Sequence, residues 1–434
     1  MFALIDGNNF YAACERAFAP HLQGHPVVVL SNNDGCVISR SEEAKQLGIR
    51  MAQPLYQIQD LVRTHGVAVR SANFALYGDM SARMMRLAAA LGPEQEIYSI
   101  DESFIGGLAG IPKLTQRAHA IRTRIERCLG IACCVGLGPT KTLAKLCNHW
   151  AKQAERGHNH LPVHWAQVCN WQDCSADEQT HALQCTPAAD IWGIGSKLAQ
   201  RLAAAQCHSA WDLQQLPAAQ ARRLGGVVLE RTVRELQGIA CIALENAPAA
   251  KQQIASTRSF GRAIENLEPL LEAVSTFACR AAEKARQSGQ LAGQVHVFAY
   301  TSPFRHERPW HGAHTVPLHP PSNDSRVLAA AATQAARHLY QAGHQLSKAG
   351  VILLDLQACT QARTHDWVDE NIYAAAPRAL MPAVDAINQR FGKHTLHVAS
   401  CGLAQQDRAG WRMKQAMLSP LYTMRYEDLP VANA

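Results

Sequence analysis

The sequence predicts a multi-domain protein that combines α/β and α+β parts. Its 434 residues are too many for one ordinary core, and 47% of them are hydrophobic, so several cores can be buried. Two apolar strands in the first quarter of the chain carry acidic residues. From about residue 254 to 356, strands and helices alternate as in a small α+β domain. These three observations favour three or four domains, one of which holds an acidic site.

Composition narrows the class of protein only slightly. The formal net charge of +7 mildly favours a polyanionic partner such as nucleic acid. The 14 cysteines are scattered along the sequence, as is typical of proteins in a reducing cytoplasm. Cys169 and Cys174 are the pair whose spacing comes nearest to that of a zinc-binding knuckle. The N-terminal apolar run lacks a basic region before it and is interrupted by Asp6. We therefore expect neither a signal peptide nor a membrane span.

The acids in the two apolar strands are the main chemical signal. Asp6 ends the run Phe2–Asp6, and Asp101 and Glu102 lie inside the run Ile97–Phe104. A buried carboxylate is costly unless a positive partner meets it, and a hard divalent cation suits several carboxylates. An exposed turn is the alternative for an Asp-Glu pair, but the apolar flanks disfavour it. Because neighbours in a regular strand point to opposite faces, both acids share a site only at a bend or hairpin tip.

Short elements surround these strands in order. The sequence predicts a helix over Phe10–Phe18, strands over Val27–Leu30 and Cys36–Ile38, and a short helix from Ser41 to Leu47. Residues 11–74 thus form a small mixed unit between the two acidic strands. The later elements of this part are a helix over Phe74–Leu91, a helix over 113–129 and a strand over Ile131–Leu137.

A helix capped by Thr140 and running to about Lys152 has two distinct faces. Lys141, Lys145, Asn148 and Lys152 share one face, whereas Leu143, Leu146 and Trp150 share the other. We expect the apolar face on the sheet and the lysine face toward an anion, with a solvated lysine face as the alternative. Three acids beside lysines form the plan of a two-metal phosphoryl-transfer site, in which Asp6 and Asp101 bridge the ions and Glu102 holds one.

Two further stretches suggest contacts with a phosphate backbone. Residues 166–236 are helical, and Ile191–Ala199 matches a helix-hairpin-helix in which Gly193 and Gly195 form the turn and Lys197 follows. The strand over 254–263 opens the α+β domain with Thr257 and Arg258, which suit phosphate contacts; edge-strand polarity is the alternative. This domain continues with a helix (266–287), strands (291–301 and about 308–317), a helix (325–342) and a strand (349–356). Helices are expected at 376–391 and 408–418.

The motifs occur together in the order of a known family. Asp6 with Phe10-Tyr11, the run Ser99–Glu102, Gly136–Pro139 before Lys141–Lys145, and the hairpin at 191–199 resemble the Y-family, or translesion, DNA polymerases. The insert Ser31–Arg40 and the tail Met417–Pro420 narrow the likeness to the UmuC branch, which supplies the catalytic subunit of DNA polymerase V. The resemblance spans nearly the whole chain.

The resemblance implies a right-hand polymerase with a ferredoxin-like palm, small fingers, a helical thumb that holds the helix-hairpin-helix and an α+β little finger. The domains it implies are a palm (1–10 and 75–165), fingers (11–74), a thumb (166–237), a linker (238–252), a little finger (253–356) and a C-terminal extension (357–434).

The resemblance also implies roles for single residues. Asp6, Asp101 and Glu102 become ligands of two Mg²⁺ ions, with the backbone carbonyl of Gly7 as a further ligand, and Tyr11 matches the steric gate that excludes ribonucleotides. The residues that match or adjoin the triphosphate site are Ser39, Arg40, Lys45 and Lys152. Lysine at position 45, where relatives often carry arginine, gives a point charge without a bidentate fork.

The implied function is error-prone, template-directed DNA synthesis across lesions in the SOS response to DNA damage. Its substrates are primer-template DNA and dNTPs, and small fingers without a proofreading nuclease agree with low fidelity. Family partners are a cleaved UmuD-type subunit and RecA, at a cytoplasmic, nucleoid-associated location. The usual clamp-binding peptide is degenerate at Gln361–Trp367, which puts clamp binding in doubt. A non-catalytic scaffold in mutagenesis and a nucleotide cyclase are the rival functions.

Overall fold

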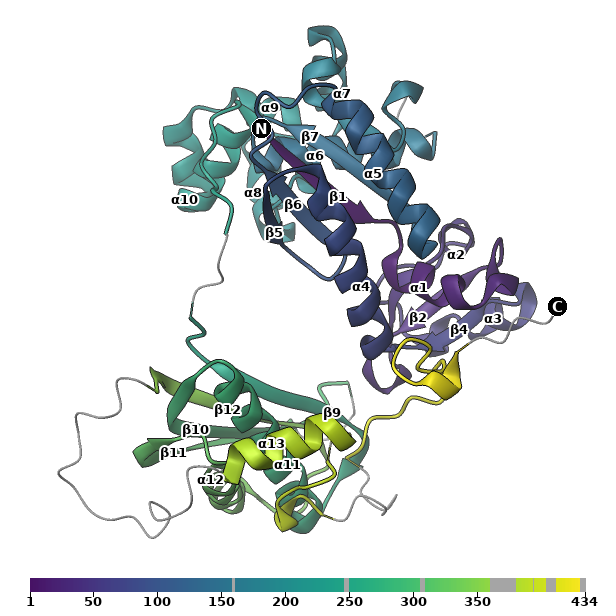
Figure 1. The fold of residues 1–434 in the computed structure, drawn as a ribbon. Coiled ribbons are helices and arrows are strands. Elements are labelled where there is room, and N and C mark those ends of the chain that lie inside the picture. The colour runs from purple at the N-terminus through teal and green to yellow at the C-terminus, as the bar shows by residue number, and fades with distance from the viewer. Residues whose placement is uncertain are drawn as a thin grey trace. The chain divides into compact units, whose positions relative to one another are not determined.

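The computed structural model describes residues 1–157, 161–245, 250–304, 309–359, 380–392, 394–402 and 411–429 (Figure 1). The chain divides into two compact units. The first unit comprises Met1–Ser31, Gly35–Pro248 and Met417–Ala434, and the second comprises Asn32–Asp34 and Ala249–Ala416. In the described part of the chain, every helix is too short or too polar to cross a membrane.

A five-stranded sheet forms the centre of the first unit, in the order β5-β6-β1-β7-β8. Its strands are β1 (Phe2–Gly7), β5 (Glu94–Ile97), β6 (Glu102–Gly106), β7 (Cys133–Gly138) and β8 (Val168–Asn170). Strand β1 is antiparallel to both neighbours, and Asp6 lies directly opposite Glu102 of β6. Cross-strand partners point to the same face, so the two acids share one side of the sheet.

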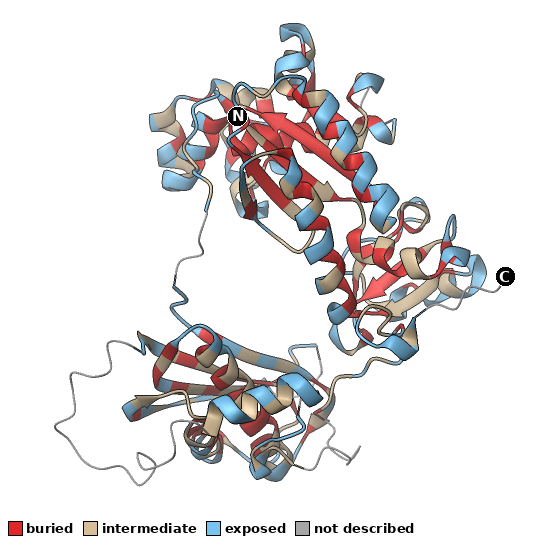
Figure 2. Cartoon of the chain, in the orientation of Figure 1, coloured by how far each residue is buried: buried red, intermediate tan, exposed pale blue. Residues whose placement is uncertain are grey.

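Helices cover both faces of this central sheet. Helices α4 (Phe74–Ala88) and α5 (Leu114–Leu129) pack on one face, where Ala3 and Ile5 of β1 enter the core. Helix α6 (Lys141–Glu155) lies on the other face, where Leu4 packs with Ala144. Strands β6, β7 and most of β1 are buried, β5 is partly exposed, and α4 and α5 keep an exposed outer side (Figure 2). This two-sided burial explains why Leu4 and Asp6 alternate with Ala3 and Ile5.

The stretch around Asp101 is a hairpin, and the prediction of one continuous strand over Ile97–Phe104 was wrong. Strand β5 ends at Ile97, and β6 begins at Glu102. The Oγ of Ser99 accepts hydrogen bonds from the backbone N–H groups of Asp101 (3.3 Å) and Glu102 (3.1 Å) and so fixes the turn. The chain therefore turns at the Asp-Glu pair, where two adjacent acids of one strand would otherwise point to opposite faces.

The prediction that the apolar face of α6 lies on the sheet was also wrong, whereas its lysine face does meet carboxylates. The lysine face lies against the sheet, where Lys141 donates to Glu96 (2.7 Å) and Asn148 donates to the carbonyl of Cys134 (2.7 Å). The apolar face, including Leu143 and Trp150, joins a core made mainly with the helices that follow. Buried acids on the sheet attract the lysines more strongly than an apolar surface would, because an unpaired buried carboxylate is costly.

A small three-stranded sheet, β3-β2-β4, follows in the first unit. It consists of β2 (Val27–Leu30), β3 (Val37–Arg40) and β4 (Ala68–Ser71). Helix α1 (Phe10–Phe18) has the predicted bounds, and α2 (Glu42–Gln46) is capped by Ser41 as predicted. Helix α3 (Gln59–His65) and strand β4 were not predicted from the sequence.

The helical region of the first unit begins after β8. Its helices are α7 (Ala176–Cys185), α8 (Ser196–Ala204), α9 (Ala210–Gln215) and α10 (Ala218–Leu236). They pack on the apolar face of α6 around a core that contains Leu183, Leu202 and Val233. Strand β8, which lies in the segment assigned to the thumb from sequence, pairs in parallel with β7.

The second unit is an antiparallel sheet covered by helices, in the order β11-β10-β12-β9. Its elements are β9 (Ile254–Ile264), α11 (Leu267–Gln287), β10 (Gln290–Thr301), β11 (His311–Ser322), α12 (Ser325–Leu339) and β12 (Leu346–Ala358). The predicted α+β pattern is confirmed. Helix α13 (Leu380–Phe391) follows, whereas residues 411–418 are not helical, so the helix expected at 408–418 was wrong there.

Gly136 allows α6 to lie close to β7, which predicts a large effect of substitution. A Cβ at this position would lie 2.1 Å from the carbonyl oxygen of Ala144 and 2.2 Å from the nitrogen of Asn148. We expect Gly136→Ala to lower the free energy of unfolding by about 3 kcal/mol or more in urea denaturation. Gly78→Ala, on an open side of α4, is the control and should raise it by up to about 1 kcal/mol. Equal stability of the two variants would contradict the close packing.

Candidate active site

Three carboxylates gather at one end of the central sheet. Asp6 ends β1, Glu102 begins β6 opposite it, and Asp101 occupies the turn before Glu102. The backbone N–H of Gly7 donates to the carbonyl of Asp101 (2.9 Å), which ties the turn to β1. The side chains of Asp6 and Glu102 are 13% and 17% exposed, so both acids are largely withdrawn from water. The hairpin therefore brings together the three acids that the sequence singled out.

Burial and the repulsion of neighbouring acids disfavour the charged forms of Asp6 and Asp101. Burial raises the pKa of Asp6 to about 6; the Lys152 ammonium opposes that shift, and Glu102 adds to it. Burial likewise raises the pKa of Asp101, a shift opposed by the Ser99 hydroxyl and increased by Asp6. The protein groups around Asp6 and Asp101 thus compensate only part of the negative charge that these acids carry when ionised.

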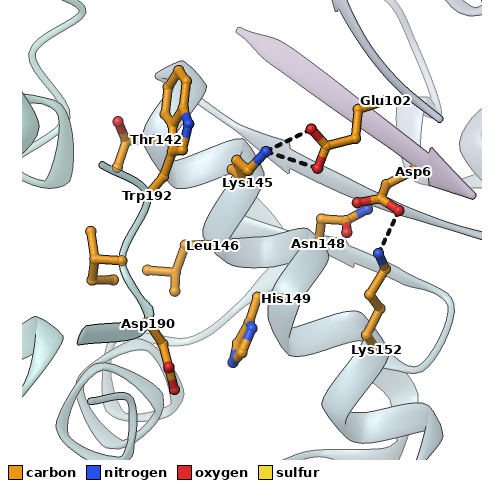
Figure 3. A pocket seen from close by; sticks show the side chains of 11 residues that line it. Asp6, Glu102, Thr142, Lys145, Leu146, Asn148, His149, Lys152, Asp190 and Trp192 are labelled. Carbon is orange, nitrogen blue, oxygen red and sulfur yellow. Dashed lines mark hydrogen bonds and ion pairs between the residues drawn. The ribbon is translucent and has the colours of Figure 1, made fainter. Parts of the chain in front are cut away.

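Two lysines of α6 compensate part of this charge. Lys145 Nζ lies 2.8 Å from both carboxylate oxygens of Glu102, and Lys152 Nζ lies 2.5 Å from Asp6 Oδ1. Figure 3 shows both ammonium groups reaching from one helix toward the sheet. Their spacing of seven residues corresponds to two helical turns, which places them on the same side of α6.

The donor set suits hard divalent cations, which prefer carboxylate oxygens. In the described ranges, no three His, Cys, Asp or Glu side chains converge closely enough to hold a metal ion in this conformation. The lysine ammonium groups occupy the positions beside Asp6 and Glu102 that a cation would compete for. The residues therefore fit a metal by chemistry, with Lys145 and Lys152 balancing the carboxylates here.

Tyr11 lies next to this acidic corner. Its ring stacks on Tyr77 of α4 with centroids 4.5 Å apart and an interplanar angle of 17°, and Phe74 meets it edge-on at 6.1 Å. Burial first, then the nearby Asp101 carboxylate, raises the pKa of Tyr11 above its ordinary value. Two aromatic neighbours thus hold the ring of Tyr11 in place near the Asp101 carboxylate.

A second cationic group lies on α2 and β3. Lys45 pairs with Glu42 (3.0 Å), which also pairs with Arg156 (3.3 Å) just after α6. Burial lowers the pKa of Arg40, and Arg156 acts in the same direction, so these cations are neighbours. The Ser39 hydroxyl is engaged differently, because it accepts from the backbone N–H of Ala12 and donates to the carbonyl of Asn9.

A cavity of about 170 Å³ opens beside the acids, between α6 and the segment Asp190–Trp192 (Figure 3). Lys145 lies over the rings of Tyr98 (4.8 Å) and Trp192 (5.5 Å), and the indole N–H of Trp192 donates to the Tyr98 hydroxyl (3.2 Å). These contacts join the hairpin that carries Asp101 to the start of the helix-hairpin-helix.

The helix-hairpin-helix presents its turn to solvent. Gly193 has a φ of 87°, which favours glycine, and Gly195 is the N-cap of α8. Both glycines and Lys197 are exposed, and space is open around the Cβ position of Gly195. Backbone N–H groups in the first turn of α8, which have no acceptor within the helix, can therefore approach a phosphate.

Thr257 and Arg258 are not brought together. They point to opposite faces of β9, and exposed Thr257 lies opposite Gly350 of β12, on the face away from the helices. Arg258 instead lies over the ring of Trp411 (5.9 Å), and burial beside Arg280 lowers its pKa to about 10. The clamp-peptide stretch 361–367 lies outside the described residues.

Sequence reasoning missed two residues of this region and the partner of a third. It placed Lys145 on the correct helix face without pairing it with Glu102, it omitted Arg156, and it gave Trp192 no role. The seven-residue spacing of Lys145 and Lys152 was the available signal. Arg156 and Trp192 depend on long-range packing that spacing does not reveal.

Comparison with known proteins identifies the family. The model of the impB/mucB/samB family matches residues 5–149, and that of its C-terminal domain matches residues 251–366. Over 433 residues the chain is 41% identical to protein UmuC of Salmonella typhimurium, covering 99% of each chain. The chain belongs to the impB/mucB/samB family. A third model, a domain of unknown function, matches residues 378–432 of this family member.

More distant relatives support the same assignment. The chain is 40% identical to protein ImpB of Salmonella typhimurium over the full length of both, and 26% identical to DNA polymerase IV of Pelotomaculum thermopropionicum, covering 91% of this chain and 93% of the relative. A Y-family DNA polymerase chimera of Dbh and Dpo4 aligns with a TM-score of 0.65 at 18% identity, covering 82% of this chain and 100% of that chain. The predicted multi-domain α/β and α+β fold of the Y-family polymerases is thus confirmed.

Because negative charges are crowded at this site, we predict that the Asp101 carboxylate destabilises the folded protein when no metal is bound. Asp101→Asn keeps an oxygen that can accept from Ser99 and removes one charge beside Asp6, so we expect unfolding free energy in EDTA to rise by about 1 kcal/mol. Asp190→Asn is the control, because this exposed acid lies on the far wall of the cavity (Figure 3). Denaturant melts in EDTA test this; a loss of stability in Asp101→Asn would contradict it.

Proposed function

We propose that this protein is an error-prone, lesion-bypassing DNA polymerase that acts in the response to DNA damage. It transfers a nucleotide from a dNTP to the 3′-hydroxyl of a primer, directed by a template, and uses two Mg²⁺ ions. Membership of the impB/mucB/samB family and the Y-family fold make it a DNA-directed DNA polymerase. The gathering of Asp6, Asp101 and Glu102 at one hairpin is the observation that carries the catalytic part.

The three acids are the proposed ligands of the metal ions. Asp6, Asp101 and Glu102, with the carbonyl of Gly7, would hold the Mg²⁺ ions. When bound, two such ions stabilise the attacking and the leaving oxygens of a phosphoryl transfer. Ser99 fixes the turn that carries Asp101 and leads into Glu102, and the raised pKa of Asp6 reflects a charge that a cation would stabilise.

The cations around the site suit the incoming triphosphate. Lys152 adjoins Asp6, and Lys45, Arg40 and Arg156 surround Glu42, so a polyanion meets several positive charges near the acids. Ser39 supports the backbone of α1 through its two hydrogen bonds, which favours a structural contribution to this pocket.

We infer that primer-template DNA is held by groups on both units. In the first unit, Gly193, Gly195 and Lys197 would grip a phosphate at the N-terminus of α8. In the second unit, Thr257 lies on the exposed sheet face, while Arg258 is occupied by Trp411. A cleaved UmuD-type subunit and RecA are proposed as partners from family membership alone, as is a cytoplasmic, nucleoid-associated location. Clamp binding is not proposed, because the usual clamp-binding peptide is degenerate at Gln361–Trp367.

Two rival functions explain the site less well. A non-catalytic scaffold has no need of three desolvated acids, which cost stability. A nucleotide cyclase shares two-metal chemistry but has no use for an exposed helix-hairpin-helix. The retained acids and the exposed glycine turn therefore favour a polymerase.

Loss of one acid should abolish synthesis. We expect Asp101→Asn to reduce Mg²⁺-dependent primer extension, including extension past an abasic site, by at least about a thousandfold, because it removes a proposed metal ligand. The assay is gel-resolved extension by the full chain, with and without its partners, and Asp190→Asn is the matched control. Equal extension by Asp101→Asn and the wild type would exclude the catalytic assignment.

Tyr11 should control the choice of sugar. An aromatic ring beside the acids would collide with a ribose 2′-hydroxyl, so Tyr11→Ala should raise the rNTP-to-dNTP ratio of kcat/KM by about a hundredfold or more. Tyr11→Phe keeps the ring and should keep the selection. An unchanged ratio in Tyr11→Ala would remove Tyr11 from this role.

A further inference from the structure

The C-terminal stretch from Met417 to Tyr422 packs on the first unit. Its start pairs with Ser71 at the end of β4: the N–H of Ser71 donates to the Met417 carbonyl (2.9 Å), and the N–H of Met417 donates to the Ser71 hydroxyl (3.0 Å). Further on, the ring of Tyr422 stacks on Phe18 of α1, with centroids 4.8 Å apart. This stretch lies within the matched domain of unknown function.

Asn73 anchors the middle of the stretch to α4. Its Nδ2 donates to the Oγ of Ser419 (3.0 Å) and to the carbonyls of Ser419 and Pro420 (3.2 Å each). Its Oδ1 accepts from the N–H of Leu76 and caps α4. Asn73 and Ser419 are 2% and 7% exposed, so these bonds form away from water, where each is costly to leave unmade.

Ser419 also binds a buried carboxylate. Its hydroxyl donates to Oε1 of Glu15 (3.1 Å), and the hydroxyl of Tyr77 donates to the same oxygen (2.6 Å). Glu15 is 1% exposed, and Arg70 is 3.9 Å from its other oxygen. Burial raises the pKa of Glu15, and the two hydroxyl hydrogen bonds lower it, so they stabilise its charged form.

The chain of contacts ends at Tyr11. Tyr77 is fully buried, and its ring is the surface on which Tyr11 stacks at 4.5 Å. Glu15 holds the hydroxyl end of Tyr77, and Ser419 helps to hold Glu15. A group at the far end of the sequence thus contributes to fixing the plane against which Tyr11 rests.

We propose that Ser419 is a positioning residue for sugar selection, acting through Glu15 and Tyr77 on the ring of Tyr11. The proposal rests on the proposed role of Tyr11 in excluding ribonucleotides. Without the Ser419 hydroxyl, the buried carboxylate loses a donor and seeks other partners, which loosens Tyr77. The ring of Tyr11 then yields to a ribose 2′-hydroxyl more readily, while deoxynucleotides are accepted as before.

The test compares kcat/KM for an rNTP and its matching dNTP in the full-length protein. Ser419→Ala should raise the rNTP-to-dNTP ratio about fivefold, the equivalent of about 1 kcal/mol for one buried hydrogen bond. Tyr77→Phe, which keeps the ring and removes the hydroxyl, should give the same direction and serves if Ser419→Ala does not fold. Tyr426→Ala, on a side chain that is 89% exposed, is the matched control and should leave the ratio unchanged.

A double-mutant cycle separates this proposal from the role of Tyr11 itself. In a Tyr11→Ala background, Ser419→Ala should add nothing to the ratio, since the ring that it positions is gone. If Tyr11→Ala alone leaves the ratio unchanged, the gate role of Tyr11 fails. If Tyr11→Ala raises the ratio, but Ser419→Ala and Tyr77→Phe leave it unchanged or lower both efficiencies equally, the positioning role of Ser419 is overturned.

Discussion

The crowding of three half-buried carboxylates is the constraint around which the first unit is organised. Asp6, Asp101 and Glu102 meet at the β5-β6 hairpin, and burial raises the pKa of Asp6 and Asp101. Lys145 and Lys152 of α6 offset part of that charge. Helix α6 must therefore lie flat on the sheet with its polar side inward, which the missing side chain of Gly136 permits.

This arrangement determines how the helical region is attached. Since the polar side of α6 faces the sheet, its apolar side is free to form a core with α7–α10. That core places Trp192 beside Tyr98 and Lys145, so the helix-hairpin-helix begins at the edge of the acidic corner. Charge compensation at the acids and attachment of the DNA-gripping motif thus use two sides of one helix.

Local pattern predicted the elements that depend on local interactions. The bounds of α1 and the cap at Ser41 followed from periodicity and capping, and the bend at Asp101 followed from the two-residue period of a strand. Periodicity gave the two faces of α6 but not their partners, because which face meets the sheet depends on acids far away in sequence. Arg156 and Ser419 likewise acquire their partners through contacts that no spacing rule encodes.

Tyr11, near the N-terminus, is linked by a series of contacts to Ser419, near the C-terminus. The acidic hairpin lies near it, as the effect of Asp101 on its pKa indicates, and Tyr77 supports its ring from α4. Tyr77 is held by Glu15, a carboxylate that needs its donors because it is buried. A sugar-excluding ring must resist displacement by an oxygen atom, and rigidity of that kind requires a supporting surface whose own polar groups are satisfied. The C-terminal stretch supplies one of those donors, which gives this part of the chain a physical reason to fold back on the first unit.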